Sequence, residues 1–141
     1  MPSPSQAEEN KRTARRLVEE FFNAGDATRA AELYTRDYAR HDPGTPDDVK
    51  GIDAITQVLT RYRSAFPDLH FIIEDMIGEG DKVMTRWTVT GTHQGNLQGI
   101  APTGRQMKLT GISLYRLTDG KVAEEWTNWD TGGMTKQLGL A

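Results

Sequence analysis

The residues of this sequence that are best suited to acid–base chemistry lie near its end, in the stretch WTNWDTGG at 126–133. Asp130 follows two tryptophans there and precedes two glycines. A carboxylate between apolar walls has a pKa above its ordinary value of about 3.9, and can then act as a general base near neutral pH. The same side chain could instead cap a short C-terminal helix. Both interpretations of Asp130 are compatible with the sequence.

Strand alternation predicts which neighbours accompany Asp130. Residues i and i+2 of a strand share one face of a sheet. Trp126, Asn128 and Asp130 are therefore expected on one face, which we predict to be the cavity side. Thr127 and Trp129 are expected on the opposite face. In this arrangement Trp126 forms an aromatic wall and Asn128 supplies an amide beside the carboxylate.

Other side chains could bind or orient a substrate. His41 and His93 could each donate to a carbonyl oxygen, although a loop or strand-end histidine is often satisfied by its neighbours. An inward Arg86 would need a partner, because a buried guanidinium is costly alone; an enolate, a carboxylate or an acid on the next strand would serve. Trp87 and Trp126 could form pocket walls, or equally parts of the core or of a dimer interface.

Composition excludes several classes of function. The chain has 141 residues, no cysteine and a net charge of −3, so thiol chemistry and disulfides are excluded and no basic stripe indicates nucleic acid. No apolar run approaches the ~20 residues that span a bilayer, and the polar N-terminus does not have the pattern of a signal peptide. The three histidines are not spaced as metal ligands. We expect a cytoplasmic protein without metal, cofactor, membrane or nucleic-acid partner.

The periodicity of apolar residues predicts a single α+β domain over 1–141. Spacing of 3.6 residues dominates the first half, and a period of 2 replaces it after Pro67. An antiparallel sheet is expected from about 69 to 130, with Asp119-Gly120 as a hairpin turn. The helices must cover one face of this sheet, and strong sheet curvature would leave a pocket beneath them. The predicted helices lie near 5–24, 26–35 and 51–65.

Several segments, in order from about residue 17 to 139, resemble the SnoaL-like polyketide cyclase branch of the nuclear-transport-factor-2-like superfamily. They are FFNAGD, YARHDP, GIDAI, FPDL, GDKVMTRWTVTGTHQG, GIAPTGR, YRLTDGKVAEEW and WDTGGMTKQLG. The resemblance implies a cone-shaped barrel, a curved antiparallel sheet packed on three N-terminal helices, with an apolar cavity. It also implies an aspartate near the end of the last strand as acid–base residue, a position that Asp130 matches. The aldol cyclases carry a histidine on the preceding strand, in the region where this chain has Ser113.

Together these observations predict a cofactor-independent enzyme acting on a small apolar carbonyl compound, by intramolecular aldol chemistry. Alternatives are a hydrolase or hydratase that activates water on the same scaffold, and a non-catalytic module that binds a hydrophobic ligand or only dimerises. A homodimer through the outer sheet face is expected, with Thr127 and Trp129 on that face. The predicted catalytic residues are Asp130 and His41, and the predicted substrate-binding residues are Arg86, Trp126, Asn128, His93, Trp87 and Ser113.

Overall fold

A computed structural model describes residues 4–45 and 47–140 of the chain. The helical elements are α1 (Pro4–Arg16), the π-helical η1 (Leu17–Asn23), the 3₁₀ turn η2 (Ala27–Arg29), α2 (Ala30–Leu33), α3 (Ile52–Ala65) and α4 (Thr131–Gln137). The strands are β1 (Tyr34–His41), β2 (Val49–Lys50), β3 (His70–Glu79), β4 (Lys82–Thr92), β5 (Gln106–Thr118) and β6 (Lys121–Trp129). Among the described residues, no helix is both long enough and apolar enough to cross a membrane.

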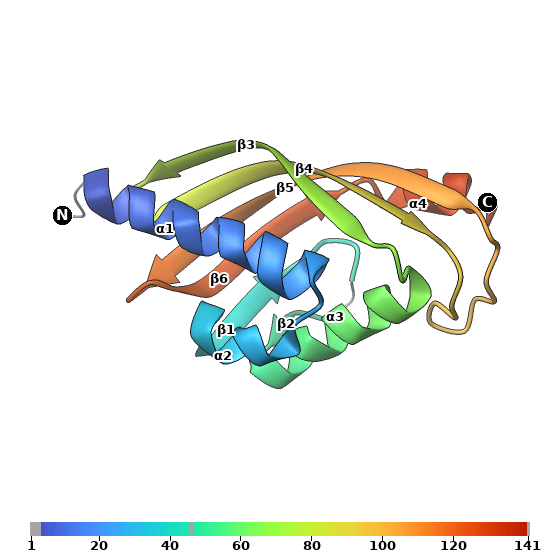
Figure 1. Ribbon diagram of the computed structural model, residues 1–141, viewed down its shortest axis with the longest axis horizontal. Helices are drawn as coiled ribbons and strands as arrows, with labels where there is room; N and C mark the ends of the chain where they lie inside the picture. Colours follow the sequence, from blue (N-terminus) through green and yellow to red (C-terminus); the bar gives the residue numbers. More distant parts are fainter. Residues whose placement is uncertain (1–3, 46, 141) are drawn as a thin grey trace.

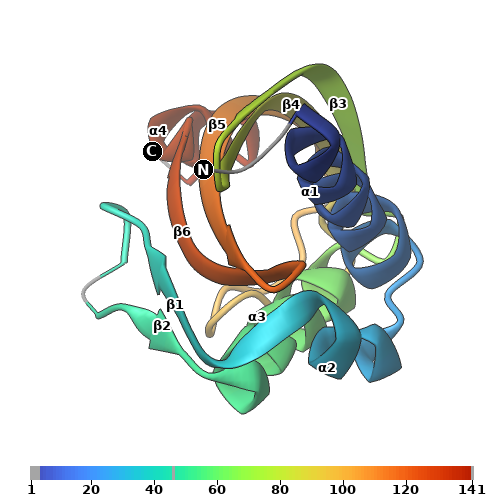
Figure 2. The ribbon, with the colours of Figure 1, turned by 90° about the vertical axis from the view of Figure 1, so that its left-hand side faces the viewer.

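The strands form one strongly curved sheet in the order β2-β1-β6-β5-β4-β3. Strands β3 to β6 make an antiparallel meander along the length of the molecule (Figure 1). Viewed end-on, the sheet curls around a central space, and α1 and α3 close its open side (Figure 2). The α+β cone that the sequence predicted is confirmed.

Two details of the prediction are wrong. The sheet is mixed, because β1 pairs in parallel with β6. The helix expected over 26–35 is only the turn η2 followed by the four-residue α2, and the chain is already extended at Tyr34. Tyr34 and Tyr38 both bury their rings, and a spacing of four residues puts two side chains on one face of a strand as well as of a helix.

The first helix is held on the sheet by its apolar face and by one amide. Leu17, Val18 and Phe21 are buried in the core. Asn23, at the end of η1, bonds both backbone groups of Phe71: its Nδ2 donates to the carbonyl at 2.9 Å, and its Oδ1 accepts from the N–H at 2.7 Å. This contact fixes the helical segment α1–η1 against the edge strand β3, so that the segment covers the concave face of the sheet.

Candidate active site

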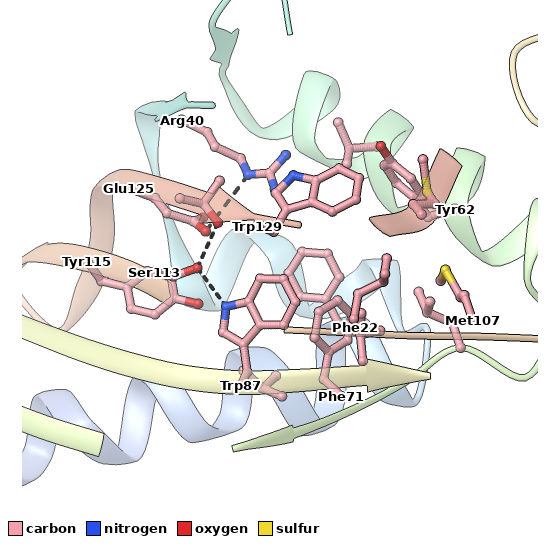
Figure 3. A pocket seen from close by; sticks show the side chains of 17 residues that line it. Phe22, Arg40, Tyr62, Phe71, Trp87, Met107, Ser113, Tyr115, Glu125 and Trp129 are labelled. Atoms are coloured by element: carbon pink, nitrogen blue, oxygen red, sulfur yellow. Dashed lines mark hydrogen bonds and ion pairs between the residues drawn. The ribbon is translucent and has the colours of Figure 1, made fainter. Parts of the chain in front are cut away.

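A cavity of about 80 Å³ lies between the concave face of the sheet and the helices. Its walls are mainly aliphatic and aromatic, and its polar lining comes chiefly from Arg40, Ser113, Glu125 and Thr127 (Figure 3). Apolar residues from both ends of the core contribute to it, among them Val18, Phe22, Val58, Phe71, Trp87, Val89, Met107, Leu109 and Trp129. A mostly apolar pocket with a few converging polar groups is the usual form of a small-molecule site.

The alternation of β6 determines which of its side chains enter this cavity. Glu125, Thr127 and Trp129 line it, whereas Trp126 and Asn128 are exposed on the other face. The prediction that Trp126 and Asn128 line the cavity is therefore wrong, as is the assignment of Thr127 and Trp129 to the outer face. Alternation correctly divided the strand into two sets of residues, but the set that contains Asp130 was taken as the inner one.

A buried ion pair lies at one end of the cavity. Glu125 is 4% exposed, and the Tyr38 hydroxyl donates to its Oε1 at 2.6 Å. Arg40 Nε lies 3.8 Å from Glu125 Oε2 and makes no hydrogen bond within the described part of the chain. The distance is too long for a hydrogen bond, so Oε2 keeps capacity to accept a proton or a further donor.

Burial sets the protonation of the groups around Glu125. It raises the pKa values of Tyr34 and Tyr38 well above the ordinary range, and the Glu125 carboxylate raises them further. Burial by itself would lower the pKa of Arg40, but Glu125, with Tyr38 and Asp42, outweighs it and the pKa is raised. At neutral pH the tyrosines are therefore phenols that can donate, and Arg40 is a cation.

Two tryptophans form opposite parts of the wall and are each fixed by a hydrogen bond. Trp87 Nε1 donates to Ser113 Oγ at 3.1 Å, and Ser113 Oγ donates to Thr127 Oγ1 at 3.0 Å. Trp129 Nε1 donates to Asp42 Oδ2 at 2.9 Å. Of the eight site residues predicted from sequence, Trp87 and Ser113 are the two that line this cavity.

Asp130 occupies a different place from the one predicted. It is exposed, and its Oδ1 accepts from the backbone N–H of Gly133 at 2.8 Å, which makes it the N-cap of α4. It borders a shallow groove on the outer face, together with Arg86, Ile112 and Asn128. The prediction that Asp130 faces the inner cavity is wrong, and the capping alternative describes its contacts.

We expect Asp130→Ala to lower the free energy of unfolding by about 1 kcal/mol, because the cap of α4 is lost. Asp130→Asn should change it little, since asparagine caps as well as aspartate. Urea unfolding curves of both variants beside the wild type measure the difference. An equal loss for the two variants would contradict the capping role.

The remaining polar candidates also lie outside the cavity. Arg86 is exposed on the outer face, so it does not bind a ligand in the cavity; its Nε instead donates to Asp75 Oδ2 at 2.7 Å, which is the pairing with an acid on the next strand that the sequence allowed. His93 is fully buried but does not line the cavity: its Nδ1 accepts from Thr103 N at 3.2 Å, and its ring packs on Phe66. The histidine thus anchors the loop between β4 and β5.

His41, the second predicted catalytic residue, is held between two carboxylates. Its Nδ1 lies 2.8 Å from Asp48 Oδ2 and its Nε2 lies 2.7 Å from Glu124 Oε2. The ring packs beside Trp126 on the outer face, with the two ring centres 5.5 Å apart, so His41 does not contribute to the cavity. The hydrogen bond with Glu124 is the main cause of the raised pKa of His41, and the one with Asp48 adds to it.

This arrangement predicts a pH-dependent stability. Because the pKa of His41 is raised in the folded state, the stabilisation is complete below the ordinary value of 6.5 and is lost as the pH rises through the folded value. The pKa of Glu124 is lowered, chiefly by His41, so its contribution is lost as the pH falls below about 4.5. The His41 contribution should be largest between about pH 5 and 6.5, and no more than about 1 kcal/mol for so exposed a pair.

Melting temperatures of the wild type and of His41→Gln between pH 5 and 9 test this expectation. The difference in melting temperature between the wild type and His41→Gln should become smaller as the pH rises. A constant gap over this range would show that the histidine does not act through its charge.

Arg40, Glu125 and Thr127 were not predicted as site residues. Tyr34 and Tyr38 are the inward residues of β1, and Arg40 follows at i+2, so the same alternation indicates an inward Arg40 once the strand is recognised. Glu125 and Thr127 belong to the set that was placed outside. Among the described residues, no cluster of three or more histidine, aspartate or glutamate side chains could hold a metal ion.

Comparisons with known proteins agree on one family. A family model described as SnoaL-like polyketide cyclase matches residues 12–138. The aklanonic acid methyl ester cyclase DnrD of Streptomyces peucetius is 31% identical over 129 residues, which cover 89% of this chain and 87% of that protein. The corresponding cyclase DauD of Streptomyces sp. (strain C5) is also 31% identical, over 89% of this chain and 78% of its own length.

Solved structures show the same fold. IdmH from Streptomyces antibioticus, described as a candidate polyketide cyclase, has a TM-score of 0.81 and 33% identity, covering 92% of this chain and 98% of that one. A candidate SnoaL-like polyketide cyclase from Jannaschia sp. CCS1 has a TM-score of 0.89 at 24% identity, and the match covers 100% of this chain and 98% of that one.

Proposed function

Because this chain belongs to the SnoaL-like polyketide cyclase family, we propose that it is a cofactor-independent acid–base enzyme acting on a small, largely apolar carbonyl compound. The observation that carries the proposal is the Glu125 carboxylate, which is buried in the wall of an apolar cavity with one oxygen not fully engaged. We assign to Glu125 the role of proton acceptor that the sequence suggested for Asp130.

The proposed reaction begins at a carbon next to a carbonyl group. Glu125 Oε2 takes a proton from this carbon, and the electron pair of the broken C–H bond moves to form an enolate. In a cyclisation the enolate carbon attacks a second carbonyl of the same molecule, and the new oxyanion takes the proton back from Glu125, which restores the carboxylate. The Arg40 guanidinium stabilises the negative charge through the low-dielectric cavity, as preorganised cations do in enzyme sites.

The size of the cavity limits the ligand. Its volume of about 80 Å³ is below the ~150 Å³ of an engineered cavity that holds benzene. Met107 and Met134 line it, and methionine side chains readily adopt other shapes. A single-ring ketone could therefore enter after rotation of these side chains, whereas a fused polycycle requires larger movements of the wall.

Deuterium exchange tests the proposal without knowledge of the natural substrate. Cyclohexanone is incubated in D₂O with and without the wild-type protein, and loss of its α-proton NMR signal is followed. We expect exchange well above the buffer rate. Binding without any acceleration would overturn the enzymatic proposal and favour the module that only binds ligands; hydrolysis of small esters without exchange would favour the hydrolase.

We also propose that the chain forms a homodimer through the outer face of the sheet. Ile77, Met84, Leu114 and Trp126 are paired across four neighbouring strands and form one row on this face. Three of the four are exposed: Ile77 at 60%, Met84 at 39% and Trp126 at 37%. Ile112, at 47%, extends the apolar surface, and such patches often mark protein contacts.

Sedimentation at micromolar concentration should give about twice the chain mass of 15.7 kDa. Ile112→Lys should shift the protein to a monomer, because a charge would be buried in the contact. A monomeric wild type, or a Lys variant that stays dimeric, would refute this contact.

A further inference from the structure

The cavity wall contains a hydrogen-bonded chain of three side chains: Trp87, Ser113 and Thr127 (Figure 3). We infer that the last hydroxyl of this chain donates to the carbonyl oxygen of a ligand, so that the site selects neutral ketones and esters. The inference rests on the proposed function, since it takes the inner cavity as the site of binding.

The three hydrogen-bonded side chains have one more donor hydrogen than the bonds between them use. An indole N–H can only donate, so Ser113 Oγ accepts from Trp87. The Ser113 hydroxyl hydrogen is then used in the bond to Thr127 Oγ1. Thr127 keeps its own hydroxyl hydrogen, and within the described part of the chain it donates to no protein acceptor. Ser113 and Thr127 are both almost completely buried and both line the cavity, so this hydrogen is available to a bound molecule.

The free donor lies next to the proposed base. Thr127 and Glu125 are alternate residues of β6 on its inner face, which places their Cα atoms roughly 6–7 Å apart. Across β5 they pair with Ser113 and Tyr115. A carbonyl oxygen bound to the Thr127 hydroxyl can therefore have its α-carbon close to the Glu125 carboxylate.

This pairing has a chemical consequence. Proton removal by Glu125 moves negative charge onto the carbonyl oxygen, and a fixed donor at that oxygen becomes stronger as the charge develops. A hydrocarbon of the same shape offers no acceptor and leaves the buried hydroxyl unpaired. Thr127 is thus a specificity-determining residue, and Trp87 and Ser113 position it.

Infrared spectroscopy of bound cyclohexanone, labelled with ¹³C at the carbonyl, tests the inference. In the wild type the carbonyl stretch should lie below its frequency in an apolar solvent, because the oxygen accepts a hydrogen bond. Thr127→Val keeps the shape and removes the hydroxyl; the stretch should return toward the apolar value and the affinity should fall about ten-fold. Methylenecyclohexane, which has no oxygen, should bind Thr127→Val at least as tightly as the wild type, because the variant has no hydroxyl to leave unpaired.

Thr85→Val is the matched control. Thr85 pairs with Ser113 across β4 and β5 and is fully buried, but it does not line the cavity, and among the described residues its hydroxyl makes no hydrogen bond of normal geometry. This variant should leave the carbonyl stretch and the affinity unchanged. If Thr127→Val does not fold, Ser113→Ala provides a second test. It removes the hydrogen bond that orients the Thr127 hydroxyl, so the lowering of the carbonyl stretch should become smaller.

A stretch that is equal in the wild type and Thr127→Val, or that shows no lowering in the wild type, would overturn the inference. Deuterium exchange separates this result from a failure of the proposed function. A lowered stretch that depends on Thr127, together with no exchange, would uphold the donor and reject the base.

Discussion

Glu125→Gln is expected to lower the rate of deuterium exchange into cyclohexanone by at least about 100-fold, the usual cost of losing a general base. Glutamine keeps the shape of the side chain and can still accept from the Tyr38 hydroxyl, but it cannot take a proton from carbon. Rates are measured by NMR at saturating ketone, beside the wild type at the same protein concentration.

Two carboxylates provide matched controls for this variant. Glu124 is the neighbouring residue on β6 and contacts His41 on the other side of the strand, and Asp130 caps α4. Glu124→Gln and Asp130→Asn should both retain the wild-type exchange rate. A large loss for Asp130→Asn with a normal rate for Glu125→Gln would return the catalytic role to Asp130.

The same change leaves Arg40 buried without its counter-charge, and breaking a buried pair in this way costs about 3–5 kcal/mol. A melting curve shows whether the single variant is folded under the assay conditions. Arg40→Gln combined with Glu125→Gln removes both charges and should recover part of this stability. It should remain without exchange activity, because the base is still absent.

Gly111→Ala is expected to destabilise the protein by about 1–3 kcal/mol, as overpacking of a rigid core does. Gly111 pairs with Trp87 on β4 and with Trp129 on β6, and it leaves the space that the Trp87 indole occupies. A Cβ atom at this position would overlap the Trp87 ring. The ring must then move, and its hydrogen bond to Ser113 is lost with it.

Thermal unfolding measures this effect, and the expected fall in Tm is on the order of 5–10 °C for a domain of this size. Gly132→Ala is the matched control, because Gly132 lies in α4 and an added Cβ would meet no described residue outside its own helical turn within 4 Å. That variant should be neutral or slightly stabilising, since alanine favours helix. An unchanged Tm for Gly111→Ala would show that Trp87 is free to move.

Much of the fold could be predicted from local patterns. The change of period at Pro67 correctly located the start of the antiparallel meander β3 to β6, and Asp119-Gly120 forms the predicted turn, with φ values of 52° and 76°. The start of strand β1 fell within the helix predicted over 26–35, because Tyr34 and Tyr38 are spaced as on a helix. Strand β2 has only two residues and leaves little pattern. The parallel pairing of β1 with β6 joins segments far apart in sequence, which no local pattern reports.

The site was less predictable for a related reason. Alternation assigns residues of β6 to two faces but does not say which face is inside, and the set that contains Glu125 and Thr127 was predicted to be the outer one. Their burial is explained only by partners on other strands, namely Tyr38 and Arg40 for Glu125, and Ser113 for Thr127. The polar residues of the cavity are therefore recognised only when contacts between different strands are known, and local sequence patterns do not report these contacts.

The central claim, that the ligand occupies the inner cavity and not the outer groove beside Asp130, is tested most directly by NMR. Nuclear Overhauser effects are measured between cyclohexanone protons and methyl groups of the protein. Met107 and Leu109 line the inner cavity, whereas Thr110 and Ile112, on the opposite face of β5, border the outer groove. We predict contacts to the methyl groups of Met107 and Leu109; contacts confined to Thr110 and Ile112 would contradict the claim.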